Sequence, residues 1–147
     1  MAAQTTYPQQ VKEVMTRDVV ALRPQQPFAQ ALALLAQHRF RHLLVIDADA
    51  RLAGVISDRD LLRCMSRESD LEGVTVADIM WSAVVTVRPA TSLSEAAAQM
   101  LGRRINCLPV VENDRVCGIL TSTDLLQAFQ TIQTHIEQEA VPEAPQE

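Results

Sequence analysis

Two short segments of the sequence each place a hydroxyl and a carboxylate three residues apart. The segment GVISDRD carries Ser57 and Asp60, and the segment GILTSTD carries Thr121 and Asp124. In both, an apolar run ends at the hydroxyl, which predicts a strand that is followed at once by a helix. Backbone N–H groups at a helix start favour an anion, and side chains three residues apart share one helix face. Each segment could therefore bind a phosphate through its hydroxyl and a ribose through its carboxylate.

Helix capping is the alternative explanation for the same residues. Ser57 or Thr121 can cap a helix, and an aspartate in the first turn favours the positive end of the helix dipole. The residue before each aspartate differs between the segments, being Arg59 in the first and Thr123 in the second. An arginine at this position can reach a phosphate through charge-assisted hydrogen bonds.

The two segments belong to an internal repeat that covers most of the chain. A shift of 65 residues lays 11–24 over 76–89, and the two stretches then match at six positions occupied by valine, methionine, arginine or proline. After a one-residue gap in a loop, 40–62 lies over 105–126. A unit of about 60 residues is too small to bury a good core alone. We therefore expect the two units to pack against each other about a pseudo-twofold axis.

Each unit reads as a short helical turn, a strand, a helix, two strands joined by a turn and a last helix, which is an α+β pattern. β-Branched and apolar runs predict strands at residues 19–22, 43–46, 52–56, 84–87, 108–111 and 116–120. Apolar stripes and a serine cap predict helices that start at residues 28, 58, 93 and 122. The chain then divides into an N-terminal extension (1–10), a first unit (11–66), a linker (67–75), a second unit with an extended C-terminal helix (76–136) and an acidic, disordered tail (137–147).

Composition argues against several classes of protein. The chain has 13 Lys and Arg against 18 Asp and Glu, and four of the carboxylates lie in the tail. The rest is near neutral, so no DNA binding is expected. No apolar run approaches the roughly 20 residues of a spanning helix, and no secretory signal is visible, so no membrane association is expected. Three cysteines without a CxxC pair favour reduced thiols and a cytoplasmic protein.

The repeated motifs resemble those of a known family. The stretches VMTRDVVALRP, HLLVID and GVISDRDLL, with their counterparts in the second unit, are similar to the CBS domain, which is named after cystathionine β-synthase. Two such domains in tandem form a Bateman module, and the resemblance covers residues 11–126. It implies two β-α-β-β-α repeats in a regulatory sensor. Many members of the family bind adenosine-containing ligands such as AMP, ATP or S-adenosylmethionine.

The resemblance also implies two crossed binding sites. In the family, the Ser or Thr and the Asp of one repeat hold phosphate and ribose. The first strand and the stretch before the hairpin of the other repeat frame the purine. The first site would then comprise Ser57, Arg59, Asp60, Val85, Thr86, Asn106, Cys107 and Leu108. The second would comprise Val20, Ala21, Arg41, His42, Leu43, Thr121, Thr123 and Asp124. The expected ligand is an adenine nucleotide (AMP, ADP, ATP or similar), and no cofactor is required.

Basic residues cluster before each hairpin, in HRFRH (38–42) and RRINC (103–107). They could meet the phosphates of a nucleotide, or they could only complement the dipole at a helix C-terminus. His38 and His42 have the i, i+4 spacing of zinc ligands, but the HExxH motif is missing, so no metal site is expected.

One position departs from the family pattern. The second unit has Trp81 where the first has Thr16, the residue typical of the family. The tryptophan could stack on a base, plug a site or lie in a dimer contact, and the sequence leaves these possibilities open.

The sequence contains no catalytic motif such as GxSxG or a P-loop lysine, so an enzyme is not expected. The preferred hypothesis is a regulatory module that binds adenine nucleotide between its repeats and signals to an unidentified regulated protein. The alternative is a ligand-free structural or interaction module that acts through dimerisation. A homodimer is expected because the last helix continues past its counterpart with an apolar stripe of Leu126, Phe129, Ile132 and Ile136.

Overall fold

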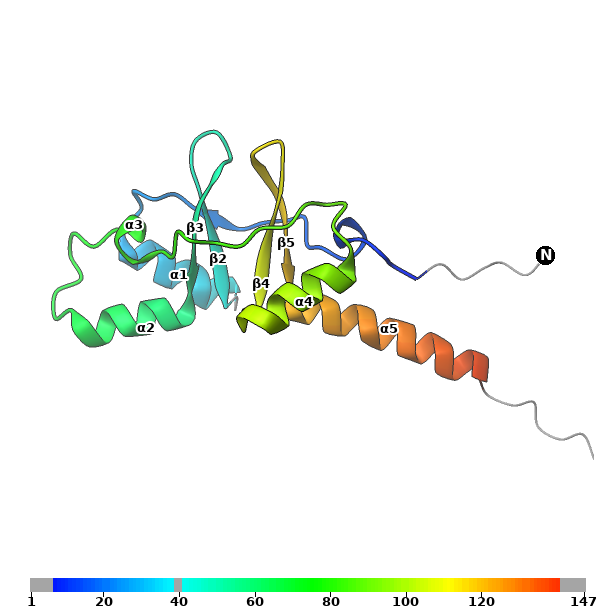
Figure 1. Cartoon of the computed structure of the whole chain (residues 1–147). Helices are drawn as coiled ribbons and strands as arrows, with labels where there is room; N and C mark the ends of the chain where they lie inside the picture. Colours follow the sequence, from blue (N-terminus) through cyan, green and yellow to red (C-terminus); the bar gives the residue numbers. More distant parts are fainter. Residues whose placement is uncertain (1–6, 39–40, 141–147) are drawn as a thin grey trace, which may run out of the picture.

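The computed structural model describes residues 7–38 and 41–140. The chain forms two similar halves, each built on a β-hairpin with helices beside it (Figure 1). The elements are η1 (Val11–Glu13), β1 (Ala21–Leu22), α1 (Phe28–His38), β2 (His42–Ile46), β3 (Leu52–Ser57), α2 (Asp58–Arg67), α3 (Val76–Ile79), α4 (Leu93–Arg103), β4 (Cys107–Glu112), β5 (Arg115–Thr121) and α5 (Ser122–Ala140). The predicted α+β fold of two repeats is confirmed, although one predicted strand does not form.

In the first half, β1 runs parallel to β2, and β2 pairs antiparallel with β3. One face of this sheet carries Leu43 and Ile56, which pack with Phe28 and Leu35 of α1 and Leu61 of α2. Side chains of neighbouring strand residues point to opposite faces, so only alternate residues of each strand enter this core. The packing holds the junction between β3 and α2 in place.

The second half has a sheet of two strands, β4 and β5. The predicted strand at 84–87 contributes only a single parallel bridge between Val87 and Val110. In it, the N–H of Val87 donates to the carbonyl oxygen of Pro109 at 3.0 Å. Pro109 has no N–H to extend the ladder, whereas the equivalent residue in the first half, Leu44, belongs to the parallel pair of β1 and β2.

The leading turns of the two repeats are exchanged between the halves. η1 lies in the second half, whereas α3 lies beside α1 in the first (Figure 1). Val11 and Met15 are buried in the second core, and Val76 is buried in the first. The N–H of Val11 donates to Thr91 O at 2.9 Å, and the N–H of Val76 donates to Gln26 O at 2.8 Å. The predicted sequence units are therefore not separate spatial units.

A third apolar cluster joins the halves. Leu44, Val55 and Cys107 are buried in it, and they come from the two hairpins that stand side by side in Figure 1. The N–H of Val116 on β5 also donates to Ala50 O at 2.9 Å, between the two hairpins. Because the halves share this cluster and exchange their leading turns, they form one folded body.

Helix α5 corrects the predicted boundary of the tail. Disorder was expected from residue 137, but residues 137–140 continue the helix. A contact of 3.1 Å between His135 Nε2 and Glu139 Oε1 supports its last turns, and the first proline after Ser122 is Pro142. The rest of the tail, the first six residues, Arg39 and residue 40 lie outside the described residues. Neither α5 nor any other described helix is long and apolar enough to cross a membrane.

Candidate functional site

Two clefts open where β3 meets α2 and where β5 meets α5. Their volumes are about 500 Å³ (cleft one) and about 640 Å³ (cleft two), within the range of small-molecule sites. Cleft one is lined by Arg41, His42, Val55, Ser57, Asp58, Arg59, Asp60, Trp81, Ala83, Val84, Val85, Arg104, Ile105, Asn106 and Cys107. Cleft two is lined by Thr16, Asp18, Val19, Val20, Arg41, His42, Leu44, Asn106, Ile119, Thr121, Ser122, Thr123, Asp124, Leu126 and Gln127. Each cleft therefore draws residues from both repeats.

The hydroxyl and the carboxylate of cleft one form a capping box at the start of α2. The N–H of Asp60 donates to Ser57 Oγ at 3.2 Å, and the N–H of Ser57 donates to Asp60 Oδ2 at 2.8 Å. Ser57 Oγ lies 3.0 Å from the same Oδ2. Ser57 and Asp60 therefore do cap α2, as the capping alternative predicted, and both residues also line cleft one. The cap uses Oδ2, which leaves Oδ1 to accept hydrogen bonds from a ligand.

Cleft two repeats this geometry with one addition. The N–H of Thr121 donates to Asp124 Oδ2 at 2.9 Å, and the N–H of Asp124 donates to Thr121 Oγ1 at 3.2 Å. In addition, the hydroxyl of Thr16 lies 3.0 Å from Asp124 Oδ1. Both carboxylate oxygens of Asp124 are therefore engaged within the chain.

A glycine precedes each hydroxyl by three residues because another segment crosses the strand there. A Cβ at Gly54 would lie 2.8 Å from Trp81 O, and a Cβ at Gly118 would lie 2.9 Å from Thr16 O. Val55 and Trp81 each donate a backbone hydrogen bond of 2.9 Å to the other. Thr16 and Ile119 do the same, so each crossing segment is bonded to its strand. The glycines thus let each crossing segment lie against the wall of a cleft.

Three residues line both clefts, namely Arg41, His42 and Asn106. Arg41 and Asn106 occupy equivalent positions in the two repeats, and each accepts a hydrogen bond from the first residue of a helix, α2 or α5. The N–H of Asp58 donates to Arg41 O, and the N–H of Ser122 donates to Asn106 O, each at 2.9 Å. The clefts consequently adjoin each other at the centre of the molecule.

Most of the predicted site residues line the cleft to which they were assigned, but four do not. Ala21, Leu43, Thr86 and Leu108 line neither cleft. Leu43 and Leu108 are 1% and 0% exposed and belong to the cores of the two halves. Ala21 packs in the cluster between the halves, and Thr86 is exposed. Side chains alternate between the two faces of a strand, and those of Leu43 and Leu108 point into the cores.

Several lining residues were not predicted from the sequence: Asp18, Leu44, Val55, Asp58, Ala83, Ile105, Ile119, Ser122, Leu126 and Gln127. Two of them carried a signal, because Asp58 and Ser122 directly follow the motif hydroxyls. Arg104 belongs to the basic cluster before β4, and it ends α4 in the left-handed conformation (φ 54°). The apolar members have no sequence signal that distinguishes them from core residues.

The wall of cleft one contains a thiol that is not a nucleophile. Burial raises the pKa of Cys107 to about 11, so the thiol stays protonated at neutral pH. No group of three or more His, Cys, Asp and Glu side chains suited to a metal ion occurs within residues 7–38 and 41–140. The polar groups of both clefts are therefore suited to hydrogen bonding and charge pairing.

We expect His42 to make the stability of the protein depend on pH. Burial lowers its pKa below the ordinary 6.5; Asp58 and Asp60 oppose this shift, whereas Arg41 and Arg59 reinforce it. Because the unfolded chain binds more protons below pH 6.5, the free energy of unfolding should fall as the pH drops below that value and level off beneath the folded pKa.

Thermal unfolding of the parent and of His42→Gln between about pH 5 and pH 8 would measure this contribution. The variant should lose less stability on acidification than the parent. Parallel pH profiles for the two proteins would contradict the prediction.

The fold and the paired clefts define a tandem-repeat module of the ligand-sensing class. The family model of the CBS domain matches the chain twice, over residues 11–67 and 76–131. The chain therefore belongs to the CBS domain family, and the resemblance of its motifs is confirmed.

Similar solved structures include CBS pairs crystallised with adenosine compounds. AcuB from Vibrio cholerae is 30% identical with a TM-score of 0.80, covering 90% of this chain and 98% of that one. CBSX2 from Arabidopsis thaliana, solved with AMP, is 32% identical with a TM-score of 0.78, covering 87% and 99%. The CBS domain pair of protein MJ0100, solved with 5′-methylthioadenosine and S-adenosyl-L-methionine, is 25% identical with a TM-score of 0.75, covering 84% and 97%.

Curated relatives include both small proteins and large enzymes. The CBS domain-containing protein YhcV from Bacillus subtilis is 31% identical over 78% of this chain and 81% of its own length. A homoserine O-acetyltransferase from Methanohalobium evestigatum is 28% identical over 78% of this chain, which spans only 23% of the enzyme. The similarity to that enzyme therefore concerns less than a quarter of its length.

Proposed function

We propose that this protein is a regulatory sensor that binds an adenine nucleotide (AMP, ADP, ATP or a similar compound) between its repeats and signals to a partner protein. The observation that carries the proposal is the hydroxyl–carboxylate pair at the start of α2 and of α5, which faces a cleft in both repeats. The AMP complex of CBSX2 and the S-adenosylmethionine complex of MJ0100 support an adenosine-containing ligand. The three free cysteines are in keeping with the reducing environment of the cytoplasm.

The arrangement of the clefts suggests how binding would be transmitted. A ligand in cleft one contacts the start of α2 in the first half, together with residues 83–85 and 104–107. A ligand in cleft two contacts the start of α5 together with Thr16 and residues 18–20. Each ligand would therefore hold the start of one helix, α2 or α5, against a segment that runs from one half to the other. The helices α2 and α5 lead from the clefts to exposed apolar side chains, where a partner protein could respond.

Nucleotide binding should raise the melting temperature of the protein. A ligand present at ten times its dissociation constant adds about 1.4 kcal/mol to the free energy of unfolding. A thermal-shift series with AMP, ADP, ATP and S-adenosylmethionine tests this, with inosine monophosphate as a control for the adenine base. If calorimetry and thermal shift both show no binding of any of the adenosine compounds, the proposal is wrong and the ligand-free interaction module is favoured.

We also propose a homodimer, formed through the exposed apolar residues of α5 and α2. Leu126 and Phe129 on α5 are 67% and 61% exposed, and Leu62 on α2 is 64% exposed. Large apolar side chains exposed on a helix surface are typical of a protein interface. A ligand-free module acting through dimerisation would use the same surface.

Sedimentation at micromolar protein concentration should give a mass near 32 kDa, twice the 16.2 kDa of the chain. Phe129→Asp should yield the monomer, whereas Thr131→Asp, on the opposite side of α5, should leave the dimer intact. A parent protein that sediments as a monomer would refute the dimer.

A further inference from the structure

We propose that the two clefts are unequal, and that cleft one is the primary site for a phosphorylated adenosine nucleotide whose base stacks on Trp81. This inference rests on the proposed function and deepens it, because it assigns the nucleotide to one of the two clefts. Three independent observations support it: the state of the two carboxylates, the placement of the indole ring and the charge of each cleft.

The carboxylates differ in their capacity to bind a ribose. In cleft two, Thr16 and Thr121 engage one oxygen each of Asp124 at 3.0 and 2.9 Å. In cleft one, all hydrogen bonds of the Asp60 carboxylate that involve residues 7–38 and 41–140 fall on Oδ2. A ribose diol can therefore approach Oδ1 of Asp60 directly, whereas in cleft two it must first displace the Thr16 hydroxyl.

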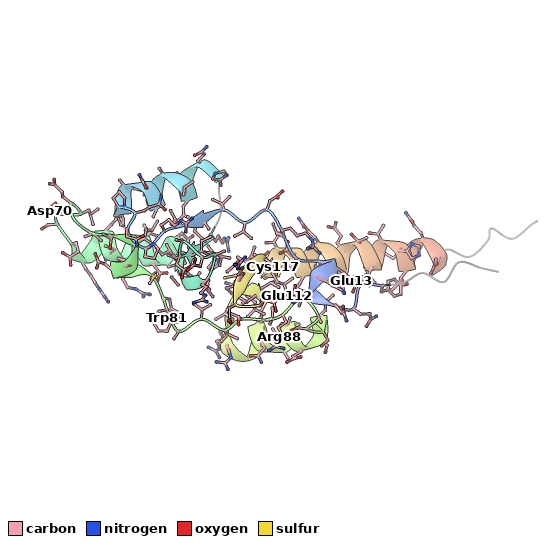
Figure 2. The ribbon with its side chains drawn as sticks, turned by 90° about the horizontal axis from the view of Figure 1, so that it is seen from above. Glu13, Asp70, Trp81, Arg88, Glu112 and Cys117 are labelled. Carbon is pink, nitrogen blue, oxygen red and sulfur yellow. The ribbon has the colours of Figure 1, made fainter. Side chains whose placement is uncertain are left out.

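The indole ring of Trp81 forms part of the wall of cleft one and is 66% exposed. Its backbone is hydrogen-bonded in both directions to Val55 on β3, and its Nε1–H donates to Ala83 O at 3.1 Å. Figure 2 shows it on the segment that leads from the first half to the second. The ring is thus held by its backbone and by its edge, which leaves its face to bind a flat aromatic group. Cleft two has Thr16 at the equivalent position, and a threonine side chain offers no such face.

The clefts also differ in net charge. The charged residues that line cleft one are Arg41, Arg59, Arg104, Asp58 and Asp60, which sum to +1. Those of cleft two are Arg41, Asp18 and Asp124, which sum to −1. A phosphate is attracted to guanidinium groups and repelled by carboxylates, so the charge directs a nucleotide to cleft one.

Trp81 is the only tryptophan of the chain, so its fluorescence reports on cleft one without a label. The full-length protein is titrated with AMP and, separately, with ribose 5-phosphate, which has the same sugar and phosphate but no base. AMP should change the emission along a saturable curve that matches the tighter site in calorimetry. Ribose 5-phosphate should leave the emission unchanged.

Two variants test the stacking directly. Trp81→Leu, which removes the aromatic face without adding a hydroxyl that could engage Asp60, should weaken AMP binding at the tighter site by about 5- to 150-fold. The same variant should bind ribose 5-phosphate like the parent. Trp81→Phe retains an aromatic face and should retain most of the AMP affinity.

The alternative outcomes separate this inference from the proposed function. AMP binding by calorimetry with unchanged emission and parental affinity in Trp81→Leu would overturn the stacking but leave the sensor intact. A tighter site that is lost in Asp124→Asn and kept in Asp60→Asn would reverse the assignment of the clefts. Emission that changes on protein dilution and not with AMP would place Trp81 in a contact between copies and overturn the proposal. No binding of AMP, ADP, ATP or S-adenosylmethionine would overturn both.

Discussion

Replacement of Gly118 by alanine is expected to destabilise the protein by about 1–3 kcal/mol, because the new methyl group has no room. Its carbon would lie 2.9 Å from Met15 Sδ and 2.9 Å from the carbonyl oxygen of Thr16. The methionine can change rotamer, but the Thr16 carbonyl is held by the N–H of Ile119 at 2.9 Å. The crossing segment must therefore move away from β5. Thermal unfolding should show a melting temperature lower by about 4 °C for each kcal/mol lost.

Gly102→Ala is the matched control, since a Cβ at Gly102 meets nothing within 4 Å. This residue lies in α4, where alanine is favoured over glycine by about 0.5–1 kcal/mol, so the melting temperature should stay or rise. Gly54→Ala should behave like Gly118→Ala, because its Cβ would lie 2.8 Å from the backbone oxygen of Trp81. Equal melting temperatures for all three variants would show that the crossing segments adapt without cost.

Removal of the carboxylate of Asp60 is expected to weaken AMP binding by about 10- to 150-fold. Loss of a charged hydrogen-bonding group costs about 1.5–3 kcal/mol, and Asp60 is the carboxylate of cleft one that lies within hydrogen-bond distance of the motif hydroxyl of Ser57. Alanine would also remove the hydrogen-bond acceptor of the Ser57 N–H, which in the parent donates to Asp60 Oδ2 at 2.8 Å. Asp60→Ala should therefore lose both affinity and about 1 kcal/mol of stability.

Asp60→Asn separates the two effects. Its amide oxygen can still accept the N–H of Ser57, so the helix cap remains, but the charge that favours the ribose hydroxyls is gone. Calorimetry with AMP should show reduced affinity, while the melting temperature without ligand stays close to that of the parent. Parental affinity in both variants would mean that Asp60 does not contact the nucleotide.

Much of the candidate site could be predicted from the sequence because it depends on short segments. The strand-to-helix junctions at Ser57 and Thr121 follow from an apolar run, a capping hydroxyl and an aspartate within one helical turn. The internal repeat shows that the motif at Ser57 has a counterpart at Thr121. The sequence also marks Trp81 as the position where the repeats differ, although it does not show which way the ring faces.

Only the tertiary structure decided how these segments meet. The exchange of η1 and α3 between the halves and the hydrogen bond from Thr16 to Asp124, 108 residues away, depend on how the two halves pack. The packing of the halves also places Arg41 in the lining of both clefts and gives the two clefts opposite net charges. Periodicity and capping act over about one turn of helix or a few residues of strand, whereas these contacts depend on the free energy of burying the cluster between the halves. The sequence by itself therefore determined which side chains are offered at each helix start, and the packing of the halves determined which of them remain available to a ligand.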